Sequence, residues 1–267
     1  MQGRDSGLGD GLTIEGNLDV TLPVPDLRIE ADTDGVFRAA AAEFQKASAD
    51  AVAARGVFRV ALSGGSTPKG LYSLLATDHA LRSAIAWDQA EFFWSDERHV
   101  PPDHPESNYR MAQDSLLSRV PVRGDRVHRV RAEQPDAAVA AIAYEVDIRR
   151  TFDCYGEVPR FDLILLGLGT DGHTASLFPG TPALDESSRL VTANHVATLG
   201  ADRITMTYPL LNAARLILFV VAGSDKAAAV RAVLQPDPDA PALPARLVQP
   251  EDGGVVWVMD RGAAGRL

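Results

Sequence analysis

The chain has 267 residues, of which 46% are apolar and 23% charged. This is the composition of an ordinary soluble protein, long enough for one large α/β domain or two small ones. Its 26 basic and 36 acidic residues give a formal net charge of −10, which argues against a general affinity for nucleic acid or for an anionic membrane. No run approaches the roughly 20 apolar residues of a membrane span. Cys154 is the only cysteine, so no internal disulfide can form, and we expect a cytoplasmic protein.

The sequence predicts a flexible leader at residues 1–26, followed by a single α/β domain at 27–267. The leader is rich in Gly and Asp and shows no sustained period. Apolar runs and turn residues then alternate along the domain. We expect strands at 27–30, 57–62, 91–94, 161–166, 190–193, 203–207, 216–222 and 254–259. We expect helices at 34–55, ending at Gly56, and at 68–76, 107–119, 135–152, 209–214 (a short helix or a turn) and from 227 to about 234.

Two of these helices carry more specific expectations. Thr67 is predicted to be the N-cap of the helix at 68–76, because Pro68 suits the first helical turn. In the helix at 135–152, Val139, Ile142 and Val146 fall on one face.

The alternation of strands and helices favours a parallel sheet with right-handed crossovers. Polar, Gly-rich turns follow four of the strands, at 63–67, 95–99, 167–173 and 223–226. In such sheets, ligands bind just outside the carboxyl ends of the strands. We therefore expect the four turns to gather at one edge and to bind a small anion.

The turn at 63–67 is a candidate phosphate site. Gly64, Gly65, Ser66 and Thr67 offer backbone N–H groups, two hydroxyls and the N-terminus of a helix. It is not the nucleotide phosphate loop, because Lys69 has the wrong spacing. A plain strand-to-helix turn is the alternative interpretation.

The turn at 167–173 supplies a candidate catalytic group. It contains Gly169, Asp171, Gly172 and His173 directly after a buried strand. Histidine has a reference pKa of about 6.5, so His173 can exchange a proton near neutral pH. The alternative is a tight turn whose histidine caps a helix or fills a gap.

Four segments resemble the glucosamine-6-phosphate isomerase/6-phosphogluconolactonase family, and within it the lactonases. They are SGGSTPKGLY (63–72), WSDERHVPPDHPESNYRMA (94–112), LLGLGTDGHTASLFPG (165–180) and the segment from RITMT (203–207) to AGSDKAAAV (222–230). The resemblance covers nearly the whole chain. It implies a three-layer α/β/α sandwich around a mostly parallel, Rossmann-like sheet. It also implies hydrolysis of 6-phospho-D-glucono-1,5-lactone to 6-phosphogluconate, a step of the oxidative pentose phosphate pathway, with no metal and no organic cofactor.

The resemblance also implies roles for individual residues. The proposed general base is His173, oriented by Asp171, although an aspartate here can simply form the turn. Backbone N–H groups of the glycine turn, or a nearby cation, would stabilise the oxyanion. The substrate-binding positions that it suggests are Gly64, Gly65, Ser66, Thr67, Asp96, Arg98, Asn108, Gly169, Gly172, Arg203 and Lys226. Asn108 has a structural alternative, and Arg203 and Lys226 have the alternative of surface cations. The expected partner is the small sugar phosphate, bound by a monomer or weak homo-oligomer.

Two competing functions remain. A glucosamine-6-phosphate deaminase shares the Gly-x-Asp-Gly-His core, but its histidine is followed by a segment ending in Asn-Glu-Pro. The corresponding stretch here, Ser176 to Pro179, has no carboxylate, which disfavours deamination. A non-catalytic sugar-phosphate sensor would usually carry a helix-turn-helix segment, for which residues 1–26 are too short and too rich in Gly and Pro.

Overall fold

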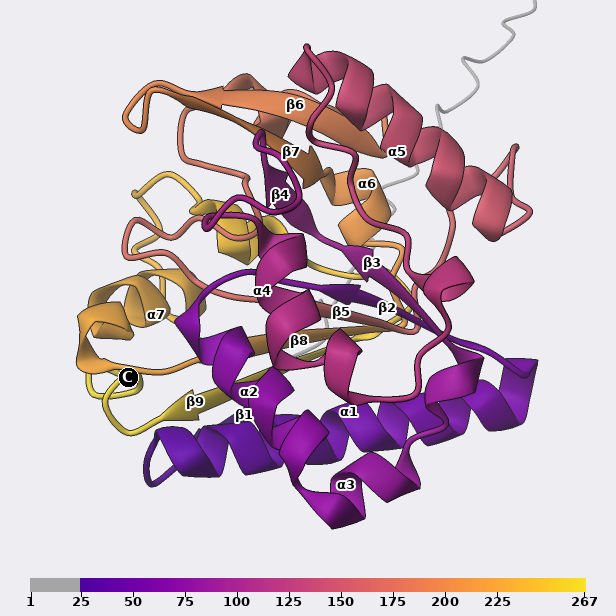
Figure 1. Cartoon of the computed structure of the whole chain (residues 1–267). Helices are drawn as coiled ribbons and strands as arrows, with labels where there is room; N and C mark the ends of the chain where they lie inside the picture. Colours follow the sequence, from indigo (N-terminus) through magenta and orange to yellow (C-terminus); the bar gives the residue numbers. More distant parts are fainter. Residues whose placement is uncertain (1–24) are drawn as a thin grey trace, which may run out of the picture.

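The structure is a computed structural model, and it describes residues 25–267 (Figure 1). The expected leader at 1–26 lies outside the described residues except for its last two. The first strand, β1 (Asp26–Glu30), begins at the final residue of that expected leader.

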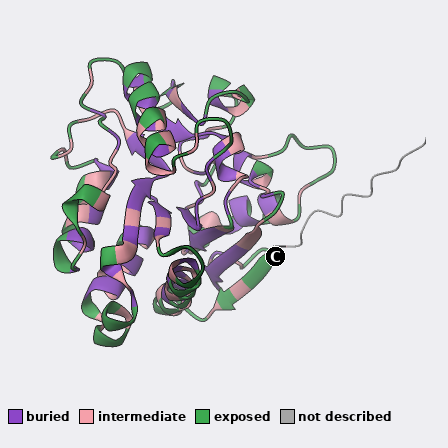
Figure 2. Ribbon diagram, turned by 90° about the vertical axis from the view of Figure 1, so that its right-hand side faces the viewer, coloured by how far each residue is buried: buried purple, intermediate pink, exposed green. Residues whose placement is uncertain are grey.

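A six-stranded parallel sheet forms the centre of the fold. Its strand order is β1-β9-β8-β5-β2-β3. All four residues of β5 (Leu163–Leu166) are buried, because other layers of the protein cover both faces of the central strands (Figure 2). The other strands are β2 (Phe58–Leu62), β3 (Ala90–Trp94), β8 (Leu216–Val221) and β9 (Gly254–Asp260).

Helix α1 (Thr33–Arg55) packs against β1, β9, β8 and β2 of this sheet. It begins at Asp32, whose carboxylate accepts a hydrogen bond from the Gly35 N–H. It ends as predicted at Gly56, which adopts a left-handed conformation with φ 71°.

Helix α2 (Ser66–Thr77) corrects one prediction, and α3 (His79–Ala84) follows it. Thr67 is not the N-cap of α2, because the helix already includes Ser66 and its N-cap is Gly65, with no side-chain capping bond. A serine and a threonine therefore lie within the first turn of the helix.

The remaining helices agree with the predictions in position but not always in length. The helix predicted at 107–119 ends early, since α4 (Asn108–Ser115) is followed by a 3₁₀ turn at Leu117–Arg119. Val139, Ile142 and Val146 of α5 (Ala137–Thr151) do share a face, but that face is exposed, and Tyr144 and Ile148 lie on the buried side. The other helices are α6 (Tyr208–Leu211) and α7 (Ala227–Leu234).

A second sheet was not predicted. Strands β4 (Asp96–Arg98), β7 (Ala201–Met206) and β6 (Val191–Val196) form a separate antiparallel sheet, against which α5 packs. Strands β6 and β7 therefore lie outside the parallel sheet that the alternation of strands and helices predicted. Only four residues join them, whereas a parallel crossover needs about a dozen. Gly200, with φ 57°, lies in that short connection.

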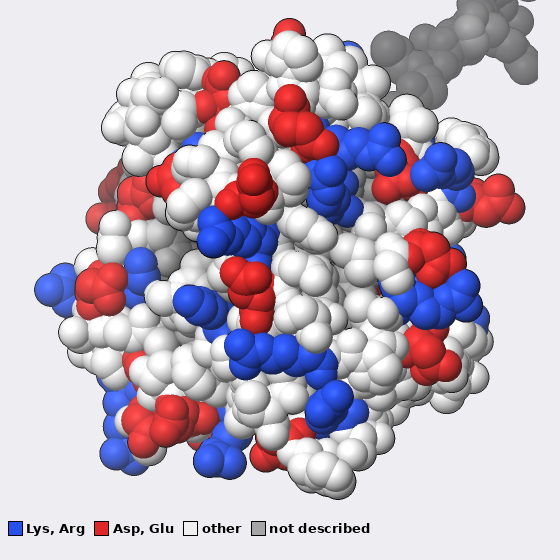
Figure 3. All heavy atoms as spheres, viewed as in Figure 1, with Lys and Arg blue, Asp and Glu red and all other residues white. Residues whose placement is uncertain are grey.

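The predicted α/β class, with helices flanking a mostly parallel sheet, is confirmed. None of the helices within residues 25–267 combines the length and apolar character needed to cross a membrane. Acidic and basic side chains are interspersed over the face drawn in Figure 3, so no single sign of charge dominates it.

Candidate active site

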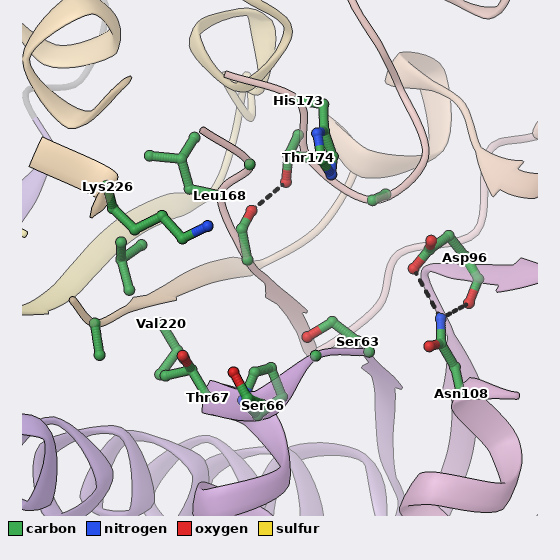
Figure 4. A pocket seen from close by; sticks show the side chains of 18 of the residues that line it. Ser63, Ser66, Thr67, Asp96, Asn108, Leu168, His173, Thr174, Val220 and Lys226 are labelled. Atoms are coloured by element: carbon green, nitrogen blue, oxygen red, sulfur yellow. Dashed lines mark hydrogen bonds between the residues drawn. The ribbon is translucent and has the colours of Figure 1, made fainter. Parts of the chain in front are cut away.

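A pocket of about 220 Å³ lies over the carboxyl ends of β2, β5 and β8 (Figure 4). All four predicted turns contribute to its lining, as their positions at the strand ends predict. Ten of the predicted site residues line it: Gly64, Gly65, Ser66, Thr67, Asp96, Arg98, Asn108, Gly169, His173 and Lys226. Asp171, Gly172 and Arg203 are not among the lining residues.

The turn between β2 and α2 forms an open anion cradle. The N-terminus of α2 has no side-chain cap, and the hydroxyls of Ser66 and Thr67 make no hydrogen bond with any residue in the range 25–267. A side chain cannot replace Gly64, because a Cβ there would lie 1.9 Å from Asn108 Oδ1. Free N–H groups at a helix N-terminus attract negative charge.

Ser63 adds a polar group to this end of the pocket that the sequence reasoning did not single out. Its side chain is 3% exposed, yet its Oγ has no hydrogen-bond partner among the described residues. Its backbone is fully used, since its N–H donates to Tyr72 Oη (2.9 Å) and its carbonyl accepts from that hydroxyl (3.0 Å). A buried hydroxyl without a partner typically costs about 1–3 kcal/mol. A ligand or an ordered water in the pocket would remove that cost.

His173 lies across the pocket from this cradle and is paired with Asp171. Its Nδ1 lies 2.6 Å from Asp171 Oδ1. With Asp171 ionised, this contact makes Nδ1 the protonated nitrogen and leaves the lone pair of Nε2 free. Burial raises the pKa of Asp171, but the N–H and imidazole of His173 outweigh it, so the pKa lies below its usual value. Asp171 therefore contacts His173 from outside the pocket lining.

The glycine turn contacts the imidazole of His173, and two of its N–H groups are bonded within the turn. A Cβ on Gly169 would lie 2.1 Å from His173 Nδ1, so the ring rests on bare backbone. The N–H of Gly169 donates to the His173 carbonyl (2.8 Å), and that of Gly172 donates to the Gly169 carbonyl (3.1 Å). These two N–H groups are therefore bonded within the turn, and stabilisation of an oxyanion by other N–H groups of the turn or by a cation stays a prediction. Gly172, with φ 82°, forms the turn and packs against Leu243.

The side of the pocket near β4 is a closed hydrogen-bond network. Asn108 Nδ2 donates to the Asp96 carbonyl (2.9 Å) and to Asp96 Oδ1 (3.3 Å). Ser176 Oγ lies 2.6 Å from Asp96 Oδ2. Asp96 and Asn108 line the pocket but are already bonded to the protein.

The next acid of the same motif, Glu97, has a structural role. Its carboxylate accepts hydrogen bonds from the N–H groups of Arg98, Asn108 and Tyr109 and from the Ser107 hydroxyl. It is 2% exposed, and burial raises its pKa despite these donors. Glu97 therefore fastens the start of α4 to β4.

Two cations line the pocket. Lys226, in the turn after β8, has Asp225 at 3.3 Å as its carboxylate neighbour. Arg98 donates to the carbonyl of Glu106 (2.7 Å) and pairs with no carboxylate among the described residues.

Arg203 lies opposite Arg98 in the register of β4 and β7. Burial and the neighbouring Arg98 charge lower the pKa of Arg203. It reinforces the positive charge behind Arg98 without lining the pocket. The pocket thus combines an anion cradle, two cations and a proton acceptor, which together suit a small anionic ligand that undergoes proton transfer.

Comparison with known proteins agrees with this arrangement. Residues 31–257 match the family described as glucosamine-6-phosphate isomerases/6-phosphogluconolactonase. The 6-phosphogluconolactonase of Nostoc sp. is 43% identical over 218 residues, which is 81% of this chain and 88% of that protein. The 6-phosphogluconolactonase of Synechocystis sp. is 44% identical, with the same coverage. The structure of 6-phosphogluconolactonase from Trypanosoma cruzi superposes with a TM-score of 0.80 at 30% identity, covering 91% of this chain and 97% of that chain. The chain therefore belongs to the glucosamine-6-phosphate isomerase/6-phosphogluconolactonase family.

Proposed function

We propose that this protein hydrolyses 6-phospho-D-glucono-1,5-lactone to 6-phospho-D-gluconate, with His173 as the general base. The observation that carries the proposal is one pocket lined both by His173, which is bonded to Asp171, and by the unpaired anion cradle at Gly64–Thr67. The names of the cyanobacterial relatives, which span most of the chain, support the same substrate.

The reaction begins with a water molecule between Nε2 of His173 and the lactone carbonyl. Nε2 takes a proton from the water as its oxygen attacks the carbonyl carbon. General-base assistance of this kind is typically worth about 10²–10⁴-fold. Asp171 holds the protonated Nδ1 edge of the ring and stabilises the imidazolium that forms.

The tetrahedral intermediate then collapses, and the bond from the carbonyl carbon to the ring oxygen breaks. The imidazolium returns its proton to that oxygen, which becomes the 5-hydroxyl of the open product. The new carboxylic acid loses a proton to solvent. No serine nucleophile is needed, and the Gly-x-Ser-x-Gly elbow of covalent hydrolases is absent from the sequence.

The two cations that line the pocket, Arg98 and Lys226, have different roles in this proposal. Arg98 joins the cradle at Gly64–Thr67 to bind the phosphate, since a guanidinium fork suits phosphate oxygens. Lys226 is then the cation left to neutralise the developing oxyanion. In this proposal Lys226 stabilises the oxyanion instead of the N–H groups of Gly169 and Gly172, which donate to carbonyls of their own turn.

Turnover of freshly prepared lactone, followed by proton release with the spontaneous rate subtracted, tests the proposal. A rate well above the spontaneous one supports it. Ammonia released from glucosamine 6-phosphate would instead show a deaminase, and binding of sugar phosphates without turnover of either substrate would show a sensor. We also propose that the protein acts in the cytoplasm, and that it is a monomer or weak homo-oligomer. Sedimentation at several concentrations tests the oligomeric state.

A further inference from the structure

The chain after His173 reverses its direction in a tight, strained turn. The Leu177 N–H donates to the Thr174 carbonyl (2.9 Å), which closes the turn. Ala175 lies inside it with φ 46°, one of two non-glycine residues in the described chain with positive φ. A side chain in this left-handed region typically costs about 1–2 kcal/mol. The surrounding structure must therefore impose the turn.

Buried polar side chains on both sides of the turn impose it. Ser176 is bonded through its Oγ to Asp96 and through its N–H to Thr205 Oγ1 (3.2 Å). Asn194 Nδ2 donates to the Ser176 carbonyl (2.8 Å) and to Thr181 Oγ1 (3.0 Å). The side chains that bond to Ser176 come from the small antiparallel sheet, and Thr181 is bonded to that sheet through Asn194.

The result of the turn is that Phe178 returns to the imidazole of His173. The two rings stack with centroids 4.0 Å apart and planes inclined by 26°. Thr181 holds Phe178 in this place, since its N–H (3.2 Å) and hydroxyl (2.8 Å) both donate to the Phe178 carbonyl.

The stacked ring supplies a restraint that the hydrogen bond from Asp171 lacks. The last torsion of a histidine side chain is broad, so rotation about it is weakly restrained. Asp171 fixes one edge of the imidazole but allows the ring to tilt about the Nδ1–Oδ1 line. Phe178 on one face, with the bare backbone of Gly169 close by, removes that tilt.

We propose that Phe178 is a positioning residue that fixes the plane of the His173 imidazole and so aims Nε2 into the pocket. This inference rests on the proposed role of His173 as the base. Misplacement of a reacting group by about 1 Å can cost up to about 10²-fold in rate. A partial loss of alignment therefore lowers kcat, whereas the phosphate cradle and the Michaelis constant KM stay unchanged.

The test compares Phe178→Leu, which removes the flat ring, with Phe178→Tyr, which keeps it. We expect kcat on the lactone to fall about tenfold in Phe178→Leu and to stay within twofold of wild type in Phe178→Tyr, with KM unchanged in both. The His173 ring protons in the NMR spectrum give a second readout. They lose the ring-current shielding of Phe178 in the Leu variant and retain it in the Tyr variant.

Wild-type kcat in Phe178→Leu would overturn the proposal, and so would an equal loss of kcat in both variants. A His173 ring signal that does not move in Phe178→Leu would show that the rings do not stack in solution. If Phe178→Leu does not fold, Phe178→Met applies the same test with a longer flexible side chain. The NMR readout needs no turnover, so it separates this inference from the proposed function: a wild-type protein without lactonase activity would contradict only the latter.

Discussion

The two sides of the pocket differ in what their polar groups bind. On the side of the parallel sheet, the Ser63 hydroxyl, the hydroxyls of Ser66 and Thr67, and the free edge of His173 have no partner within residues 25–267. On the side of the antiparallel sheet, Asp96, Asn108 and Ser176 are bonded to one another.

This difference distinguishes polar groups that can bind a ligand from polar groups that hold the protein backbone in place. Buried polar groups in proteins are nearly always hydrogen-bonded, so a group left open at a pocket is available to a ligand. Groups that satisfy one another hold the backbone in place and have little left to offer a ligand. We therefore assign ligand recognition and catalysis to the open side together with Arg98 of β4, and the alignment of the His173 loop to the groups that are bonded to one another. The following predictions test that division.

The largest effect is expected at His173. Replacing it with Ala or Asn removes the proton acceptor and leaves the cradle at Gly64–Thr67 intact. We expect kcat to fall by about 10²-fold or more, with nearly unchanged affinity for 6-phosphogluconate. Steady-state kinetics and calorimetry measure the two quantities. A folded His173→Ala protein with near-wild-type kcat would remove His173 from the mechanism and leave Asp96 or Asp171 as the candidates.

The next largest effects separate the two cations of the pocket. Losing a charge-assisted hydrogen bond costs about 1.5–3 kcal/mol, which is roughly tenfold or more in affinity. We expect Arg98→Ala to raise KM for the phosphorylated lactone by that factor, and to leave KM for unphosphorylated gluconolactone nearly unchanged. Lys226→Ala should instead lower kcat on both substrates. Equal losses on both substrates in Arg98→Ala would move Arg98 from the phosphate to the lactone ring or the fold.

The rate should also fall on acidification, by about tenfold per pH unit below the pKa of the base. A protonated imidazole can no longer accept a proton from water. The pKa of Asp171 lies below its usual value, so Asp171 stays ionised over the pH range in which an imidazole ordinarily gains its proton. The contribution of ionised Asp171 to folding stability is lost only as the pH falls toward its lowered pKa. The acid limb of a plot of log kcat against pH should therefore have a slope of one, and a slope of two would contradict this assignment.

A smaller effect compares two serines that follow neighbouring strands. The Ser63 hydroxyl is unpaired at the pocket, whereas Ser95 Oγ donates to the Leu62 carbonyl (3.2 Å). One hydrogen bond contributes about 0.5–1.5 kcal/mol. We expect Ser63→Ala to raise KM about three- to tenfold without lowering the melting temperature. Ser95→Ala should lower the melting temperature by about 2–4 °C and leave KM unchanged. The reverse pattern would contradict the division between the open and closed sides.

Metal removal is expected to have no effect. Within residues 25–267, no group of three or more His, Cys, Asp or Glu side chains is arranged to hold a metal ion. Exhaustive treatment with EDTA should therefore leave the lactonase rate unchanged. A loss of activity that added metal restores would overturn the metal-free mechanism.

The sequence predicted the parallel sheet and the meeting of its turns because both follow from local pattern. Runs such as Phe161–Leu166 are apolar throughout, and Gly-rich turns mark their carboxyl ends. The antiparallel sheet was missed, although the four residues between β6 and β7 are too few for a crossover.

Other features depend on contacts between segments that are distant in the chain, and no local pattern encodes them. The Ser63 hydroxyl is unpaired only because of how the pocket walls meet. The stacking of Phe178 on His173 requires Ala175 in a left-handed conformation, which Asp96 and Asn194 impose through Ser176. The N–H groups of Gly169 and Gly172 donate within their own turn, which the motif alone does not reveal.

The most direct test of the central claim is a crystal structure of the protein with 6-phosphogluconate. We predict that the phosphate lies at the N-terminus of α2, on Gly64–Thr67 and Arg98, and that the carboxylate carbon lies nearest to Nε2 of His173. A phosphate bound at His173, or a carboxylate out of reach of Nε2, would contradict the account.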